Sequence, residues 1–348
     1  VKGNISDETY SMRAGFGLPL GKFSIGADVG YDVGIMAKQK DLRNRNTDMN
    51  FNIALSATCK LGTAVRLGLD GGYSRASEKI EYKQIAANNE NYLYYLRGLW
   101  LYSKYGYSSA ETLRQNMANK AFTDFTIDWN IGSHWRLFNN VGAYWRWQEQ
   151  TETGYNNLRY GDVTEFGLSE KLRVQFKDIH RIDAEFSMMR QNGLRYLQQE
   201  QNDPRSGTRR YVNYGDPLHC YYGDRLNALL GYSFRKAFDI EAGAGLRYSS
   251  QDRIYVEYPF SFSQKFSSLE PYVSFSKFIT AGKTRWEISP SVSYRIKLTG
   301  VINDVAVAGS ARHEALSDMQ LTGPLDFEAD FFGQDRLGTS LALGCELR

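Results

Sequence analysis

Acidic residues at alternate positions are the first candidates for chemistry in this chain of 348 residues. Asp28 and Asp32 share the polar parity of one alternating run, and Asp124 and Asp128 share that of another. Two carboxylates four positions apart on a strand are about 13 Å apart, because a strand rises about 3.3 Å per residue. A pair so separated does not act on one bond without a third group, so acid–base catalysis is not predicted.

Basic residues occupy similar positions on neighbouring runs. If these runs line the inside of a barrel, opposed acidic and basic side chains can select solutes by charge, hold a plug, or keep the wall solvated. We favour the structural roles over solute selection. The charges predicted to face the lumen are Asp28, Asp32, Asp124, Asp128, Arg136, Arg146, Asp239, Glu241 and Arg247.

An aromatic segment lies inside the long link Gln84–Lys120 and is too apolar for a loop in water. Either it folds into the barrel mouth and packs on its own aromatic side chains, or it docks another protein, since Tyr, Trp and Arg anchor interfaces. Stacking on sugar rings is a weaker third reading, because no carboxylate cluster accompanies the segment. Ser109–Ala118 is then predicted to form a short helix. The candidate partner-binding residues are Tyr92, Tyr94, Tyr95, Arg97, Trp100, Tyr102 and Tyr105.

Histidine and cysteine residues form no recognisable site. His219 next to Cys220 is the one local pair with metal-ligand chemistry, and metal sites normally need three or four ligands. Cys59 and Cys345 have apolar parity and are interpreted as small apolar fillers. We therefore expect no catalytic residues, no metal site and no cofactor.

Long alternating runs must position these residues. Apolar and polar residues alternate through Phe23–Ile35, Asp48–Leu61, Phe238–Tyr248 and Trp286–Leu298. Such alternation gives a strand one apolar and one polar face. Runs of about 11–14 residues exceed the usual five or six, and they are typical of membrane-spanning barrel strands. Several runs carry aromatic residues towards their ends, as expected at the two membrane interfaces.

The connections alternate between short and long, as periplasmic turns and extracellular loops do. Short turns are predicted near Leu20–Lys22, Gly62–Ala64, Gly132–His134, Lys177–His180, Lys236–Ala237 and Gln264–Ser268. Longer links are predicted at Lys38–Thr47, Gln84–Lys120, Gln148–Leu158 and Gln199–Leu218. The count is about fifteen strands, including a weakly patterned one at Val301–Ala311. Because bacterial barrels have an even number, this count predicts a strand or a plug before Val1.

Composition excludes several classes. No stretch approaches the roughly 18 apolar residues of a transmembrane helix, and the mean hydropathy is −0.49. Basic and acidic residues nearly balance, at 42 and 39, so the clustered basic face of a nucleic-acid binder is not expected. The sequence has no Pro- or Ser-rich linker, which predicts a single domain over residues 1–348.

The Gly- and aromatic-rich strands and the closing segment Leu337–Arg348 resemble an outer-membrane β-barrel family of Bacteroidota with no established activity. The resemblance covers essentially the whole chain. It implies an all-β fold, an antiparallel transmembrane β-barrel of about 14–16 strands, in contact with outer-membrane lipid and lipopolysaccharide. Arg348 stands where such chains usually end in an aromatic residue, and no catalytic residue is implied.

Three functions remain open at this point. The aromatic segment favours a non-enzymatic accessory subunit of a larger outer-membrane complex, bound to another outer-membrane protein. The alternative is a channel or transporter for small or hydrophobic solutes. An outer-membrane hydrolase is a weaker third choice, because it needs a nucleophile with a histidine base and Ser108 and Ser109 have no histidine nearby in sequence.

Glu170 breaks the apolar pattern, since it shares lipid-facing parity with Leu168 and Leu172. A carboxylate facing lipid is unfavourable. Two interpretations follow: the register shifts at this point, or another protein covers the position.

Overall fold

Strands joined by tight turns make up nearly all of the part of the chain that its computed structural model describes. That part comprises residues 5–38, 43–83, 92–98, 101–106, 112–152, 158–202, 209–236, 240–257, 260–281, 284–306, 331 and 334–347. Within these ranges, no helix has the length and hydropathy that a membrane-spanning helix needs.

The described residues form fifteen strands, and most are much longer than those of globular proteins. Their bounds are β1 Ile5–Leu20, β2 Phe23–Lys38, β3 Arg43–Leu61, β4 Val65–Lys83, β5 Tyr92–Gly98, β6 Leu101–Gly106, β7 Thr112–Ile131, β8 Trp135–Glu152, β9 Leu158–Phe176, β10 His180–Asn202, β11 Arg209–Lys236, β12 Ile240–Glu257, β13 Phe260–Ala281, β14 Thr284–Ala306 and β15 Arg336–Leu347.

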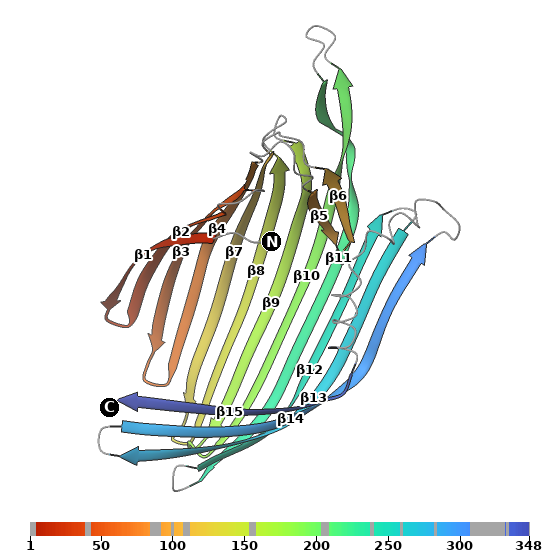
Figure 1. The fold of residues 1–348 in the computed structure, drawn as a ribbon. Helices are drawn as coiled ribbons and strands as arrows, with labels where there is room; N and C mark the ends of the chain where they lie inside the picture. Colours follow the sequence, from red (N-terminus) through yellow and green to blue (C-terminus); the bar gives the residue numbers. More distant parts are fainter. Residues whose placement is uncertain are drawn as a thin grey trace.

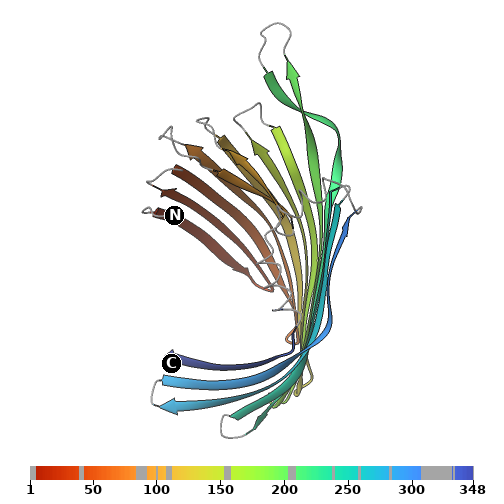
Figure 2. The ribbon, with the colours of Figure 1, turned by 45° about the vertical axis from the view of Figure 1, so that its right-hand side comes forward.

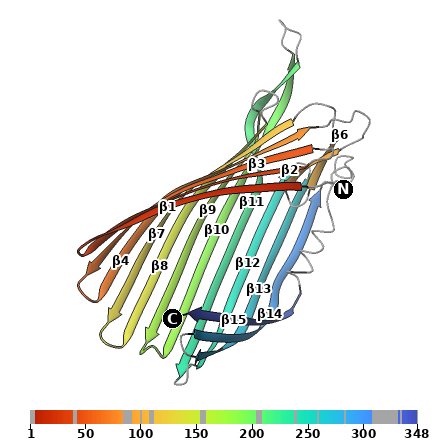
Figure 3. The same ribbon diagram turned by 60° about the vertical axis from the view of Figure 1, so that its left-hand side comes forward.

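Thirteen of these strands form one antiparallel sheet in sequence order, while β5 and β6 pair separately as a small hairpin. The large sheet is a meander that curves into a deep trough, with β1 and β15 as its two edges (Figures 1 and 2). Viewed from the side of β1, the strands run obliquely and nearly side by side (Figure 3). The all-β antiparallel prediction is confirmed. The expected strand or plug before Val1 stays a prediction.

The register divides the sheet into two chemically different faces. Directly paired residues of an antiparallel sheet lie on the same face, so the face of Asp28 can be followed from strand to strand through the pairs. We call this face the inner face and the opposite one the outer face. A depression lined by Arg136, Phe138, Arg173 and Gln175 lies on the inner face, as expected for the concave side of the trough.

The outer face carries most of the large exposed apolar side chains. On β2 these include Phe23 and Ile25, and on β11 they include Leu230 and Tyr232. Aromatic residues lie towards both ends of this band, for example Trp135 and Trp145 on β8. The apolar band with aromatic borders is what a lipid-facing barrel surface requires.

Tight turns connect the strands at one end of the sheet, which we call the short-turn end. Gly21, Gly62 and Gly132 have positive φ values of 66°, 70° and 65°, which these tight turns need and glycine adopts without strain. The opposite end, the long-link end, carries the β10–β11 hairpin, which projects beyond the other strands (Figure 1). Predicted short turns at residues 20–22, 62–64, 132–134 and 177–180 agree with the structure.

Two predictions about the long-link end are wrong. Thr112–Ala118 belongs to β7 and is not helical, whereas Ser109–Glu111 lies outside the described residues. Gln199–Leu218 is not a simple exposed loop, because β10 continues to Asn202 and β11 begins at Arg209. These extensions lie beyond the apolar band, so lipid imposes no alternation on them, and backbone pairing alone holds them.

The predicted strand division near the end of the chain is also wrong. Gln264–Ser268 is not a turn but lies within β13, and Val301–Ala306 continues β14. Polar residues at outer positions, such as Ser263 and Lys265, made this part of β13 look like a turn. The extra residue Leu298 shifts the pairing of β14 with β13, which obscured the alternation after it. Of the predicted turn Lys236–Ala237, Lys236 ends β11 and Ala237 lies outside the described residues.

Among the described residues, the few well-buried large apolar side chains lie on the inner face. Tyr255, Phe262 and Phe266 are 1%, 3% and 5% exposed and lie at the long-link end of β12 and β13. Leu158, at 4%, pairs with Glu152 on the same face. A sheet with so small a core depends on its inter-strand hydrogen bonds and on its surroundings.

Candidate functional site

The candidate site is the charged inner face. Nine charged side chains were predicted to face the lumen. One of them, Asp239, lies outside the described residues. The register places the other eight on the inner face. They are Asp28, Asp32, Asp124, Asp128, Arg136, Arg146, Glu241 and Arg247.

Ion pairs cross the inner face near the short-turn end. Asp183 accepts a hydrogen bond from Arg173 at 2.6 Å and forms an ion pair with Arg181 at 2.7 Å. Arg181 forms a second ion pair with Glu241 at 2.9 Å. The pairs therefore link β9, β10 and β12 in one row of alternating charge. Most of these side chains are between a fifth and a half exposed, so each pair contributes about 0.2–1 kcal/mol to stability.

A cavity of about 390 Å³ opens halfway along β9–β14. Glu270 lies between two guanidinium groups, at 3.1 Å from Arg247 and 3.6 Å from Arg295. The Arg247 guanidinium also stacks over the Tyr272 ring at 4.4 Å. Ser169, Lys171, Glu185, Ser187, Asn227 and Ser249 are among the other lining residues. The cavity offers many hydrogen-bond donors and acceptors and carries both signs of charge.

Carboxylates gather on the inner face of β2–β7. Asp70 and Asp124 are direct register partners, so two like charges lie side by side on β4 and β7. Asp28 and Asp32 lie further along the same face on β2. Among the described residues, no group of three or more His, Cys, Asp or Glu side chains is arranged to hold a metal ion.

Buried polar groups mark the inner face towards the long-link end. Glu165 is 7% exposed and accepts from Tyr144 at 2.7 Å and from Gln191 at 2.5 Å, and the Lys120 ammonium lies 4.3 Å from the Tyr144 ring centre. Beyond them, burial and the nearby Glu152 carboxylate raise the pKa of Tyr160.

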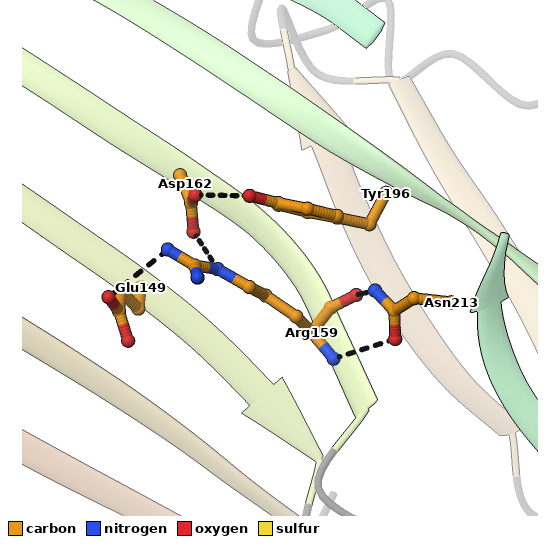
Figure 4. A network of polar contacts seen from close by, with 5 residues as sticks. All are labelled: Glu149, Arg159, Asp162, Tyr196 and Asn213. Atoms are coloured by element: carbon orange, nitrogen blue, oxygen red, sulfur yellow. Dashed lines mark hydrogen bonds and ion pairs between the residues drawn. The ribbon is translucent and has the colours of Figure 1, made fainter. Parts of the chain in front are cut away.

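A second polar network lies on the outer face, beyond the apolar band (Figure 4). Arg159 reaches Asp162 at 2.7 Å and Glu149 at 3.1 Å, while Tyr196 donates to Asp162 at 2.8 Å. The Asn213 amide donates to the Arg159 carbonyl at 2.7 Å and accepts from its backbone N–H at 3.3 Å. Burial and the bond to Asp162 raise the pKa of Tyr196. The network ties the β10–β11 hairpin to β8 and β9.

The predicted aromatic docking residues are only partly placed. Tyr92, Tyr94, Tyr95 and Arg97 belong to β5, and Tyr102 and Tyr105 belong to β6. Their side chains, and Trp100 as a whole, lie outside what the structure describes. Their role in partner binding stays a prediction.

The sequence interpretation missed three inner-face residues whose contacts the structure shows, namely Glu270, Glu165 and Arg295. Glu270 was overlooked because a turn was predicted just before it, and Glu165 because its burial depends on Tyr144 and Gln191 from other strands. Arg295 has the polar parity of the Trp286–Leu298 run, and that parity was the available signal.

This antiparallel sheet, curved around a charged inner face and apolar on the outside, has the fold of a transmembrane β-barrel wall. The chain belongs to DUF6850, a family of unknown function, whose family model matches residues 1–346. Its predicted origin in Bacteroidota stays a prediction. No curated protein sequence matches the chain.

Several solved structures are similar in fold. The copper transporter OprC has 10% identity and a TM-score of 0.48, and the match covers 83% of this chain and 53% of that one. The RagAB peptide importer in its closed-closed state has 10% identity and a TM-score of 0.43, with 87% and 47% covered. The toluene transporter TbuX of Ralstonia pickettii has 12% identity and a TM-score of 0.33, with 81% and 75% covered. The chain thus spans about half the length of the first two proteins.

Proposed function

We propose that this protein is a bacterial outer-membrane β-barrel that conducts or transports polar solutes. The observation that carries the proposal is the division of one sheet into an apolar outer band and a charged inner face. Trp135 and Trp145 are ten residues apart on β8. That separation is about 33 Å along the strand, or about 25 Å across the membrane at a tilt of about 40°. The apolar band therefore fits the outer membrane.

The inner face supports polar rather than hydrophobic solutes. A route for hydrophobic solutes needs an apolar lining, whereas most residues that line the inner cavity carry a charged, hydroxyl or amide group. Arg247, Glu270 and Arg295 put both signs of charge within one site. Such a lining favours uncharged polar or zwitterionic solutes over ions of one sign.

An accessory subunit of a larger outer-membrane complex is a second candidate function. The projecting β10–β11 hairpin favours it, because a partner protein can bind a surface that extends beyond the membrane (Figure 1). The aromatic residues of β5 and β6 would add to that surface. Contact with outer-membrane lipid and lipopolysaccharide is part of both functions.

Swelling of proteoliposomes tests the proposed transport. The full-length protein is reconstituted, and swelling is measured in isotonic solutions of a sugar and of a zwitterionic amino acid. We expect faster swelling than in liposomes carrying the same protein unfolded by heat. Swelling at the protein-free rate with both solutes would overturn the transport proposal. Stoichiometric co-purification of another outer-membrane protein, with no swelling by this chain alone, would favour the accessory subunit.

A further inference from the structure

The outer face carries one acidic side chain in the middle of its apolar band. Glu170 pairs with Val141 on β8 and with Phe186 on β10, and both registers continue unchanged on either side of it. The structure therefore excludes a register shift as the reason for its apolar parity. Glu170 is exposed on the outer face.

The depth of Glu170 makes its position costly in lipid. On β9 it lies between Phe176, towards the short-turn end, and Phe166, towards the other, with Leu172 and Leu168 as its nearest outer-face neighbours. A carboxylate at such a depth is disfavoured in a bilayer, and polar groups there usually contact protein.

Asn139 accompanies Glu170 and makes the pair chemically self-complementary. The Asn139 amide donates one N–H to Glu170 Oε1 at 3.0 Å. Each side chain makes no other hydrogen bond within the described residues, so one amide N–H of Asn139 and the second oxygen of Glu170 remain available. A pair that offers one donor and one acceptor can bind a second copy of itself through two equivalent hydrogen bonds.

The surface around the pair permits such an approach. Small outer-face residues, Ala143 on β8 and Ala184 on β10, flank Asn139 and Glu170. Val141 and Phe186 beside them are 42% and 39% exposed. Small residues and inter-chain hydrogen bonds are the features that drive association within a membrane, where apolar contact alone gives little advantage.

We propose that the outer face of β8 and β9 is the contact between two copies of this chain in the membrane. The two copies meet about a two-fold axis, so that Asn139 of each donates to Glu170 of the other. The inference rests on the membrane-spanning part of the proposed function but not on the solute. Failure of the swelling assay and failure of dimerisation are therefore distinct results.

Disulfide cross-linking in native membranes tests the contact. Cys59, Cys220 and Cys345 are replaced by Ala, and a single cysteine is introduced as Val141→Cys or, as the control, Val292→Cys. Both valines lie on the outer face and are similarly exposed, at 42% and 45%, but Val292 is on β14. We expect a dimer under mild oxidation with V141C and none with V292C. Equal cross-linking of both variants, or of neither, would overturn the proposal.

Substitution of the polar pair gives a second, independent test. The mass of the purified full-length protein in mild detergent is compared for wild type, Glu170→Leu, Glu170→Gln and the control Thr339→Leu, which replaces an outer-face polar residue on β15. We expect dimeric wild type, E170Q and T339L, and a dissociation constant at least about tenfold higher for E170L, because each contact occurs twice. Heat-dependent gel mobility confirms that each variant is folded. A dimeric E170L, or binding of a different protein in place of a second copy, contradicts the proposal.

Discussion

Glu270 binds Arg247 across β12 and β13, with its Oε1 atom 3.1 Å from Arg247 Nη1. The carboxylate is 18% exposed and the guanidinium 50%. The pair lies at the inner cavity, and Arg295 approaches the other carboxylate oxygen at 3.6 Å. One carboxylate thus balances part of the charge of two guanidinium groups on the inner face.

Removing that carboxylate should change the charge preference of the lumen. Glu270→Gln keeps the shape of the side chain but leaves Arg247 and Arg295 uncompensated. One unit of charge at about 5 Å in water is worth about 0.8 kcal/mol, so we expect about a fourfold rise in anion over cation permeability at low salt. Reversal potentials in planar bilayers under a salt gradient measure it. An unchanged potential would show that this cavity is not on the conduction path.

Two adjacent leucines on opposite faces test the assignment of an apolar outer face and a polar inner face. Leu230 is 59% exposed on the outer face, whereas Leu229 lies on the inner face and lines the cavity. Leu230→Arg should destabilise the folded protein by about 2–4 kcal/mol, the cost of a basic side chain in the lipid. Leu229→Arg should cost much less, since its charge reaches a polar cavity. Denaturant unfolding in lipid vesicles measures both, and equal losses contradict the face assignment.

The sequence predicted which face of the sheet each strand residue lies on, but it did not predict which charged side chains contact one another. Alternation placed Asp28, Asp128 and Arg247 on one face, because lipid imposes a strict two-residue period on the outer side. The partner of a charged residue depends on the register between neighbouring strands. Arg181, for example, binds both Asp183 on its own strand and Glu241 two strands away in the sheet.

The ends of the strands were predictable only at the short-turn end. There, Gly21, Gly62 and Gly132 with positive φ end three of the strands close to the apolar band. At the other end, strands such as β7 and β11 continue beyond the lipid, and their residues follow no apolar period. A helix was therefore predicted over Ser109–Ala118, but its described part, Thr112–Ala118, forms a strand through backbone pairing with β4 and β8.

A close approach on the inner face should make one glycine sensitive to substitution. A Cβ atom added at Gly167 would overlap the ring of Tyr144, whose hydroxyl donates a hydrogen bond to the buried Glu165. Gly167→Ala should cost about 1–3 kcal/mol, because the ring must move and weaken that hydrogen bond. Gly17→Ala is the control, since nothing lies within 4 Å of its added Cβ atom. Thermal unfolding in detergent compares them, and an equal loss in both variants argues against this packing.

The network in Figure 4 should hold the projecting hairpin to the rest of the sheet. Asn213 on β11 makes both of its hydrogen bonds to the backbone of Arg159 on β9. Asn213→Ala removes both, and a loss of about 1 kcal/mol corresponds to about fivefold faster opening of the contact. Hydrogen exchange at the Arg159 amide measures the effect, with Ser249→Ala on the inner face of β12 as a distant control. Faster exchange in the Asn213 variant alone supports this role of the network, because the Asn213 side chain bonds directly to the Arg159 backbone amide. Equal exchange in both variants contradicts it.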